Sequence, residues 1–288
     1  MNKFDMLHEI NTKLLIELDR VCRKHDVQYF MDSGTLLGAV RHKGAIPWDD
    51  DVDVAMTREN YNKFVRDCVP DLSEGYQFIR PSDYGKNHFY DYIPHLAYVN
   101  SRPMKPDEHT KFYKGLLNHV LLDIFILDDD TDSARGQKIH TIQTKLLYGL
   151  SWAYRESIDY SVYRSVEKIG VWVLAHLGKL TSQRHRAEAF HAHATKFNGK
   201  GYKTLYMANT IFPEMHLVYP KKWFESAVNL EYEGHEFMAP VGYKKILTRM
   251  YGDYMQLPPE EDRVPKHFDP NDPEFLCDLD GSFDPSRC

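Results

Sequence analysis

The sequence of 288 residues has only four cysteines, at 22, 68, 277 and 288, and none of them forms a C-x-x-C pair. This spacing excludes a zinc knuckle and a dense disulfide framework, and it fits the reducing cytoplasm. A long apolar run is also missing, since the longest one, 169–178, is too short to span a bilayer and contains His176. The expected location is therefore the cytoplasm, with peripheral contact at the inner face of the membrane left open.

Basic residues are fewer than acidic residues. Lysine and arginine total 36 against 42 aspartates and glutamates, which gives a net charge of -6. Proteins that bind duplex nucleic acid carry a basic surface, so no nucleic-acid partner is expected. The hydrophobic content of 42% is enough for a sizeable core, and the length fits one large domain with or without a helical extension.

Hydrophobic periodicity predicts both helices and strands. Apolar residues recur every three or four positions across 5–25, which indicates an amphipathic helix. The segment 28–56 has the pattern strand, turn, short helix, loop and strand. Further strands are expected at 76–79, 95–99, 120–127 and on both sides of Glu233-Gly234, and helices at 57–68, over most of 133–198 and at 240–251. We therefore predict a core of residues 1–132 and 200–257, a helical subdomain of 133–199 and an irregular tail of 258–288.

Two aspartates, Asp51 and Asp53, lie two residues apart at a predicted strand, so they share one face while Val52 and Val54 share the other. Carboxylates roughly 6–7 Å apart at a partly buried site are not both ionised at low cost unless a cation lies between them. Oxygen ligands favour Mg²⁺ or Mn²⁺. The alternative is a solvated acidic loop, which would not need the alternating valines.

The turn at Ser33, Gly34 and Thr35 opens a short helix. Backbone N–H groups at such a turn can bind an anion, and glycine allows a phosphate to approach closely. Positive charge follows at Arg41, His42 and Lys43. For Arg41 and Lys43 the alternative is the favourable interaction of a cation with a helix C-terminus.

The stretch GTLLGAVRHKGAIPWDDDVDVAM, residues 34–56, resembles the signature of the LicD cholinephosphotransferases, which are related to the fukutin and fukutin-related phosphoribitol transferases. The segments around Arg102, Asp123 and 251–263 are similar as well. The resemblance implies an α+β fold of the nucleotidyltransferase (polymerase-beta-like) type, a mixed sheet flanked by helices. It also implies metal-dependent transfer of phosphocholine, or a similar phospho-alcohol, from CDP-choline or a related CDP-alcohol. The acceptor would be a sugar hydroxyl of a cell-surface glycan or teichoic acid precursor, free or lipid-linked, and CMP would leave.

The resemblance also assigns site residues. By the matching motifs, Asp51, Asp53 and Asp123 would hold the metal. Asp49 has the same strand parity as the pair but follows a turn expected at Pro47 and Trp48, so we interpret it as a secondary ligand or the base that activates the hydroxyl. From residue type and position we assign substrate contacts to Ser33, Gly34, Thr35, Arg41, His42, Lys43, Trp48, Arg102, Arg263 and His267. Aromatic residues suit the quaternary ammonium of choline, and the candidates are Trp48, Tyr84, Tyr90 and Tyr92, with a role in the core as the alternative. This sequence departs from relatives in lacking a zinc-binding cysteine cluster and in having Pro103 after Arg102.

Asp123 lies within an apolar run, on the strand face opposite Leu122 and Ile124. A buried carboxylate must find a partner or take a proton. The partner could be a structural ion pair or a backbone N–H, or Asp123 could face Asp51 and Asp53 from an adjacent strand.

Two other functions stay open. A metal-dependent glycosyltransferase could use Asp51-Val52-Asp53 as a D-x-D motif for a nucleotide sugar, although the preceding Gly-Thr helix argues against it. A non-catalytic module that binds cations or glycans is the more distant alternative, because it would not require a third carboxylate in an apolar strand.

Overall fold

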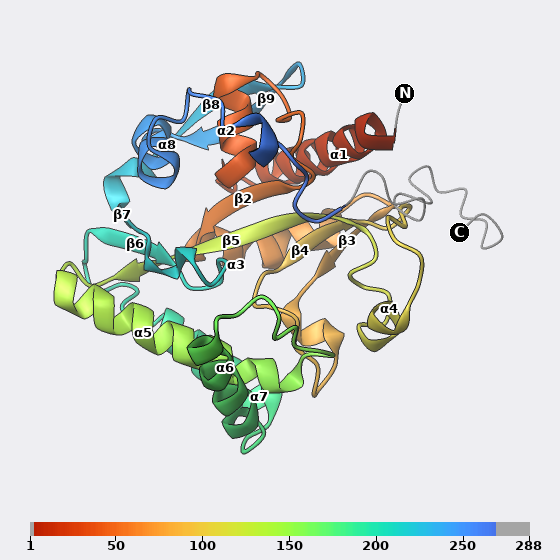
Figure 1. Cartoon of the computed structure of the whole chain (residues 1–288). Helices are drawn as coiled ribbons and strands as arrows, with labels where there is room; N and C mark the ends of the chain where they lie inside the picture. Colours follow the sequence, from red (N-terminus) through yellow and green to blue (C-terminus); the bar gives the residue numbers. More distant parts are fainter. Residues whose placement is uncertain (1–2, 269–288) are drawn as a thin grey trace.

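A mixed sheet of seven strands organises the chain in the computed structural model, which describes residues 3–268 (Figure 1). The strand order is β1-β2-β5-β4-β3, and β6 pairs with β5 and β7. The strands are β1 (Phe30–Met31), β2 (Val52–Thr57), β3 (Tyr76–Ile79), β4 (His95–Tyr98), β5 (Val120–Asp130), β6 (Thr204–Met207) and β7 (Val218–Pro220). Strands β2 and β5 run parallel, and the other pairs are antiparallel. The predicted hairpin is β8 (Ala227–Tyr232) with β9 (His235–Pro240).

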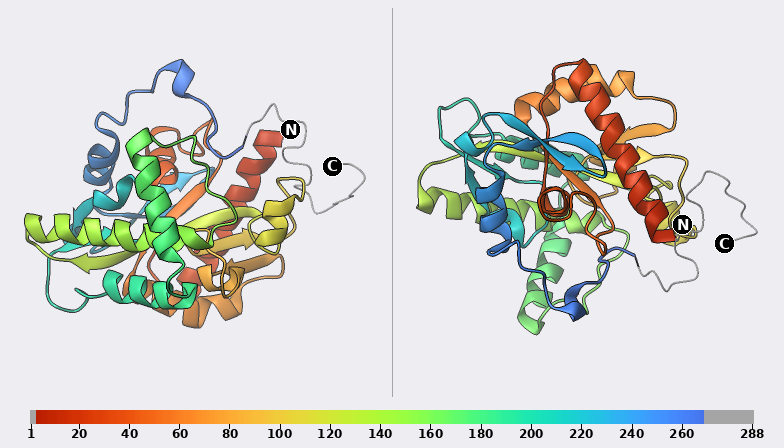
Figure 2. Two further views of the ribbon diagram at one scale, coloured as in Figure 1. Left: turned by 60° about the horizontal axis from the view of Figure 1, so that its bottom comes forward. Right: turned by 90° about the horizontal axis from the view of Figure 1, so that it is seen from above.

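Helices cover both sides of the sheet (Figures 1 and 2). They are α1 (Lys3–Lys24), α2 (Ser33–Arg41), α3 (Arg58–Lys63), α4 (Glu108–Phe112), α5 (Ala134–Ser151), α6 (Ser165–Gly178), α7 (Gln183–Ala194) and α8 (Tyr243–Tyr251). In Figure 1, α1, α2, α8 and the hairpin lie above the sheet, and α5, α6 and α7 lie below it. The predicted α+β architecture is confirmed. No helix in the described part of the chain is both long and apolar enough to cross a membrane.

The predicted stripe of α1 is the side that packs on the sheet. Leu7, Leu14, Leu18 and Val21 are fully buried in the main core, so the apolar spacing fixes which face of the helix turns inward. Thr57 caps α3, because its hydroxyl accepts a hydrogen bond from the N–H of Asn60.

A second apolar cluster joins the helices of 133–199 to the rest of the chain. It packs Tyr148, Trp152 and Phe190 against residues outside this segment, among them Tyr92 and Tyr206. The helical segment therefore packs directly on the sheet, and its definition as a separate subdomain stays a prediction. The described part of the predicted tail, 258–268, is irregular apart from a short 3-10 turn at Glu260–Asp262. Residues 269–288, with Cys277 and Cys288, lie outside the described residues.

Strand β5 is longer than predicted, and each of its three terminal aspartates has a side-chain partner. Asp128 forms two hydrogen bonds with Arg58, of 2.9 and 2.6 Å. Asp129 pairs with Lys221 at 2.7 Å, and Asp130 bonds to His140 at 2.8 Å. Two of these partners, Arg58 and Lys221, are 70 and 92 positions away, so the acidic run alone suggested the end of the strand.

The pair of Arg58 and Asp128 gives a prediction about stability. The Asp128 side chain is only 1% exposed, so Arg58→Leu leaves a buried carboxylate with Asn198 as its remaining side-chain partner. We expect the free energy of unfolding to fall by about 3 kcal/mol, measured by urea denaturation at neutral pH. The control is Arg66→Leu, since Arg66 pairs with Asp67 in solvent and its loss should leave the midpoint unchanged. Equal effects of both substitutions would show that burial of the pair is unimportant.

Candidate active site at the start of strand β2

The parallel pairing of β2 and β5 brings two predicted site residues together. Asp53 is the register partner of Asp123, and Asp51 directly precedes β2. Behind them, Val52 and Leu122 are fully buried. Asp53 and Asp123 therefore lie side by side on adjacent strands, as predicted.

These carboxylates lie where negative charge is unfavourable. Burial, followed by the charge of Asp49, raises the pKa of Asp51 to about 7. Burial, followed by the charges of Asp51 and Asp123, raises the pKa of Asp53 well above its usual value. The described side chains around them therefore supply too little positive charge for all the carboxylates to ionise easily, which is the environment that favours a bound cation.

Asp123, whose side chain is 27% exposed, is paired with a buried histidine. Its Oδ1 lies 2.7 Å from Nδ1 of His95 on β4, and Nε2 of His95 lies 3.7 Å from Asp91. Burial opposes a charge on His95, but the attraction of Asp123 outweighs it and raises the pKa of His95 to about 10. The imidazolium thus holds Asp123 in place. The sequence analysis missed His95 and Asp91.

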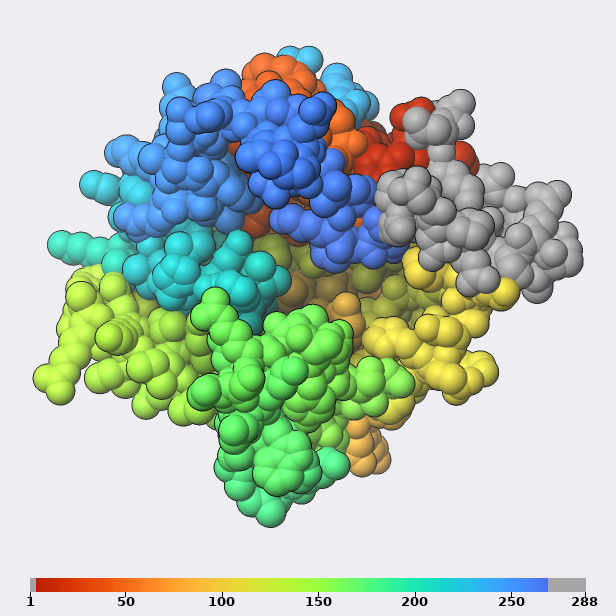
Figure 3. Space-filling model, viewed as in Figure 1, coloured from red at the N-terminus to blue at the C-terminus, as the bar shows by residue number. Residues whose placement is uncertain are grey.

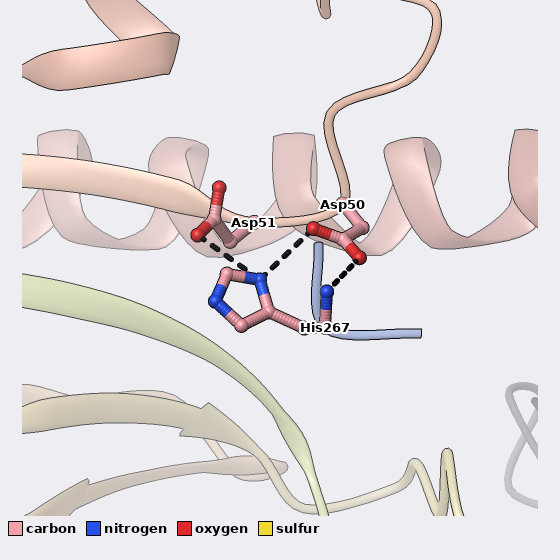
Figure 4. A group of neighbouring side chains, drawn as sticks. All are labelled: Asp50, Asp51 and His267. Atoms are coloured by element: carbon pink, nitrogen blue, oxygen red, sulfur yellow. Dashed lines mark hydrogen bonds and ion pairs between the residues drawn. The ribbon is translucent and has the colours of Figure 1, made fainter. Parts of the chain in front are cut away.

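The chain beyond Arg263 returns to the site through His267 (Figure 4). The carboxylate of the buried Asp50 accepts hydrogen bonds from the backbone N–H groups of His267 and Phe268, at 2.8 and 3.0 Å, and from Nδ1 of His267 at 2.9 Å. Nδ1 also lies 3.4 Å from Asp51. The hydrogen bond that His267 donates to Asp50 is the main cause that raises the pKa of His267 to about 9. His267 is therefore a cation at neutral pH that offsets the charge of two aspartates.

Within residues 3–268, one group of three acidic or histidine side chains has potential ligand atoms within 4.8 Å of one another, and it consists of Asp50, Asp51 and His267. The carboxylate oxygen atoms of the predicted ligands Asp51, Asp53 and Asp123 do not lie as close to one another. Two of its carboxylates are held by histidines, Asp51 by His267 and Asp123 by His95. Asp50 was not predicted as a site residue either. It lies between Asp49 and Asp51, so in an extended strand its side chain would point to the opposite face.

A cavity of about 590 Å³ opens beside these residues. Figure 3 shows the surface hollowed between the blue C-terminal segment and the green helical part. Among the predicted site residues, Asp51, Asp123 and His267 line the cavity, and so does the candidate aromatic Tyr90. Its wall also contains Asp50, Asp91, His95, His109, His119 and Lys266.

Comparison with known proteins agrees with this geometry. Residues 26–112 match the family described as LicD/FKTN/FKRP, nucleotidyltransferase domain. The chain is similar to the lipopolysaccharide cholinephosphotransferase LicD of Haemophilus influenzae, with 29% identity over 259 residues, which cover 86% of this chain and 89% of that protein. It is also 44% identical over 120 residues to an uncharacterized protein of Rickettsia typhi, covering 42% of this chain and 29% of the other. By these matches the chain resembles the LicD proteins. The fold is the nucleotidyltransferase-like α+β fold that the resemblance implied.

The start of α2 positions β2. The hydroxyl of the buried Thr35 accepts a hydrogen bond from the N–H of Asp53 at 2.8 Å. The N–H of Asp32 donates to the carbonyl of Asp53 at 3.0 Å, and Ser33 follows with a positive φ of 47°. Thr35 therefore fixes the backbone of a predicted metal ligand, and its own contact with substrate stays a prediction.

Gly34 allows a close approach, as predicted, but its neighbour is Asp49. A Cβ atom at Gly34 would lie 2.1 Å from Oδ2 of Asp49, so any side chain there would displace this carboxylate. Burial raises the pKa of Asp49 to about 6. The Asp49 carboxylate thus lies at the helix start where we expected a phosphate. It is absent from the residues that line the cavity.

Five other predicted substrate contacts gather at the far end of α2. Arg41 donates to the carbonyl of Tyr254 at 3.1 Å, and the guanidinium of Arg263 lies 5.6 Å from the ring centroid of Trp48. The rings of His42 and Trp48 meet edge to face. The carbonyl of Lys43 accepts a hydrogen bond from the β8–β9 turn. These contacts attach the segment 254–263 to α2, and none of the five residues lines the cavity.

Arg102 lies behind the cavity wall. Its Nη1 donates to the carbonyl of Val99 and to Nδ1 of His119, both at 2.7 Å, and His119 lines the cavity. Burial, followed by the charge of Arg102, lowers the pKa of His119 to about 4. Arg102 thus holds a neutral histidine in the wall of the cavity.

The lowered pKa of His119 predicts a loss of stability in acid. In the unfolded chain the imidazole of His119 binds a proton near pH 6.5, whereas in the folded chain it does so only near pH 4. The contribution of His119 is therefore complete above pH 6.5 and is lost as the pH falls towards 4. We expect roughly 2–4 kcal/mol of the free energy of unfolding to disappear in this window. His119→Gln should flatten the pH dependence measured by urea denaturation, whereas the exposed His185→Gln should preserve it. An unchanged slope in His119→Gln would contradict the assignment.

Proposed function

We propose that the protein transfers phosphocholine, or a similar phospho-alcohol, from a CDP-linked donor to a sugar hydroxyl of a cell-surface glycan or teichoic acid precursor. The similarity to the Haemophilus influenzae cholinephosphotransferase over 86% of the chain supports the reaction type. The observation that carries the proposal is the β2–β5 register, in which Asp53 lies beside Asp123, together with Asp51 and Asp123 in the wall of the cavity.

The residues fit a divalent cation. Asp51, Asp53 and Asp123 offer oxygen atoms only, which is the ligand chemistry of Mg²⁺ or Mn²⁺. The raised pKa values of Asp51 and Asp53 indicate that this negative charge lacks compensation. When bound, such a cation neutralises charge on the donor phosphates.

The chain itself can position the donor phosphates. The imidazolium of His267 and the ammonium of Lys266 border the cavity next to Asp51, so they can donate charge-assisted hydrogen bonds to phosphate oxygens. Behind the site, His95 fixes the orientation of Asp123. These residues favour in-line attack by limiting the positions that the phosphates can take.

In the proposed reaction, the acceptor oxygen forms a bond with the distal phosphorus, and the bond between this phosphorus and the CMP oxygen breaks. The acceptor hydroxyl gives up a proton, for which Asp49 is the proposed base. Its pKa of about 6 lies close to neutral pH, as a general base requires.

Tyr90 is the aromatic residue that best fits a choline group. It is 38% exposed, it borders the cavity, and its ring contacts Tyr84, His109 and Tyr113. A quaternary ammonium over such a ring gains on the order of 0.5–2 kcal/mol. Tyr84 is buried behind Tyr90, whereas Tyr92 stacks on Phe190 and Trp48 lies near Arg263.

A donor panel tests the proposal. Purified protein is incubated with Mg²⁺ and with CDP-choline, CDP-ribitol or UDP-sugars, and the released nucleotide is identified by chromatography. We expect CMP from CDP-choline and none after thorough chelation. Release of UDP from a UDP-sugar alone would favour the D-x-D glycosyltransferase, and no turnover of any donor in the presence of glycan precursors would favour a binding module.

A further inference from the structure

Helix α6 is apolar on both of its sides. Val171, Ala175 and Gly178 are buried against α5 and the turn at Trp152–Tyr154, and Gly178 lets α6 approach the carbonyl of Leu150. On the opposite side lies a stripe that we name the α6 face. It consists of Val166, Ile169, Trp172, Val173, Leu177 and Leu180.

The α6 face is strongly exposed. Val166 is 82%, Ile169 66% and Leu180 78% exposed, and the residues follow the spacing of one side of a helix. Figures 1 and 2 show α6 on the outside of the group formed by α5, α6 and α7. A contiguous apolar stripe on a soluble surface marks a site of contact with another apolar phase.

The charge of the residues around the α6 face indicates which kind of partner binds it. Residues 133–203 contain twelve lysines and arginines but only four aspartates and glutamates, although the whole chain has a net charge of -6. Lys168 on α6 and Lys179 at its C-terminal end are exposed, and so are Arg135, Lys138 and Arg184 on the neighbouring helices. A basic surround attracts an acidic partner and repels a second copy of the same surface.

We propose that the α6 face binds the surface of a bilayer that contains anionic lipids. A helix of 14 residues is about 21 Å long, too short to span the hydrocarbon core. It would lie in the interface, with its apolar side chains among the acyl chains and the lysines at the headgroups. This inference goes beyond the proposed transfer reaction and does not depend on it.

The segment that leads into α6 also contacts the cavity wall. Arg155 donates two hydrogen bonds to the carbonyl of Tyr90, at 3.1 and 2.8 Å, and Glu156 lies 3.6 Å from His109. Both Tyr90 and His109 line the cavity. Binding through α6 would therefore hold the cavity wall close to the membrane, where a lipid-linked acceptor would lie.

Vesicle sedimentation of the full chain tests the proposal. One set of vesicles contains phosphatidylcholine alone and the other contains equal parts of phosphatidylcholine and phosphatidylglycerol, so that any contact with choline headgroups occurs in both. We expect binding to the anionic set, with a blue shift of tryptophan fluorescence from Trp172. No donor or metal is added, so failure of this test and failure of the transfer reaction are separate results.

Two kinds of variants separate the apolar contribution to vesicle binding from the electrostatic one. The double substitution Ile169→Asp with Leu177→Asp should abolish sedimentation, whereas Val241→Asp with Met255→Asp, at exposed positions near α8, should preserve it. Lys168→Gln and Lys179→Gln should each lower the partition coefficient about fivefold, since a basic residue near an anionic surface contributes about that factor. Thermal melting checks that every variant is folded.

Three results would overturn the proposal. The first is no binding to anionic vesicles, and the second is equal binding by the Ile169 and Leu177 double variant. The third is a concentration-dependent dimer in gel filtration that this variant abolishes, without vesicle binding by the unmodified chain. It would assign the α6 face to self-association.

Discussion

Asp53→Asn should lower turnover roughly 10³-fold or more, because it removes charge from the site where the donor phosphates are neutralised. Asp51→Asn should have a similar effect. The fold should persist, since asparagine has nearly the same volume, and burial together with the neighbouring carboxylates already opposes ionisation of Asp53. Without metal, the free energy of unfolding should stay equal or rise. Turnover is measured as nucleotide release, and stability by urea denaturation.

Asp26→Asn is a suitable control for these substitutions, because the Asp26 side chain is fully exposed. It should change neither turnover nor stability. If Asp53→Asn kept near-normal turnover while its Mg²⁺ affinity was also unchanged, the assignment of Asp53 as a ligand would be wrong.

Asp123→Asn should also lower turnover sharply and weaken Mg²⁺ binding, but its effect on stability should differ from that of Asp53→Asn. The substitution leaves His95, which is 2% exposed, without its carboxylate partner at 2.7 Å. Loss of one partner of a buried pair is destabilising. We therefore expect the metal-free protein to unfold at lower urea concentration, measured beside calorimetric titration with Mg²⁺.

His95→Asn separates the two roles of Asp123. Because His95 acts through Asp123, its loss should cost about 10–100-fold in metal affinity or turnover, less than Asp123→Asn itself. A destabilised Asp123→Asn that binds Mg²⁺ normally when folded would show that Asp123 is only structural and that the third ligand lies elsewhere.

The predictable parts of the site depend on local patterns. The alternation of Val52 and Val54 with Asp51 and Asp53 indicated the inward and outward sides of β2, and the α2 turn at Gly34 was evident from its residue types. Both are features of short sequence range, where strand parity and turn chemistry determine the backbone.

The unpredicted parts depend on contacts between distant segments. The pairing of His95 with Asp123 requires the register of β4 on β5, and that of Asp50 with His267 spans 217 positions. Arg41 and Arg263 looked like phosphate contacts by charge, yet Arg41 donates to the carbonyl of Tyr254 and Arg263 to the carbonyl of Pro258. Residue type indicated their charge but not which partner would neutralise it.

The most direct test of phosphocholine transfer is to identify which bond of the donor breaks. Purified protein, Mg²⁺, CDP-choline and a glycan precursor are followed by ³¹P nuclear magnetic resonance, with mass spectrometry of the glycan. Transfer through the distal phosphorus predicts CMP in solution and phosphocholine attached to the glycan, both absent with Asp53→Asn. Free phosphocholine together with a glycan that carries CMP would contradict it, because the attack would then occur at the nucleotide phosphorus.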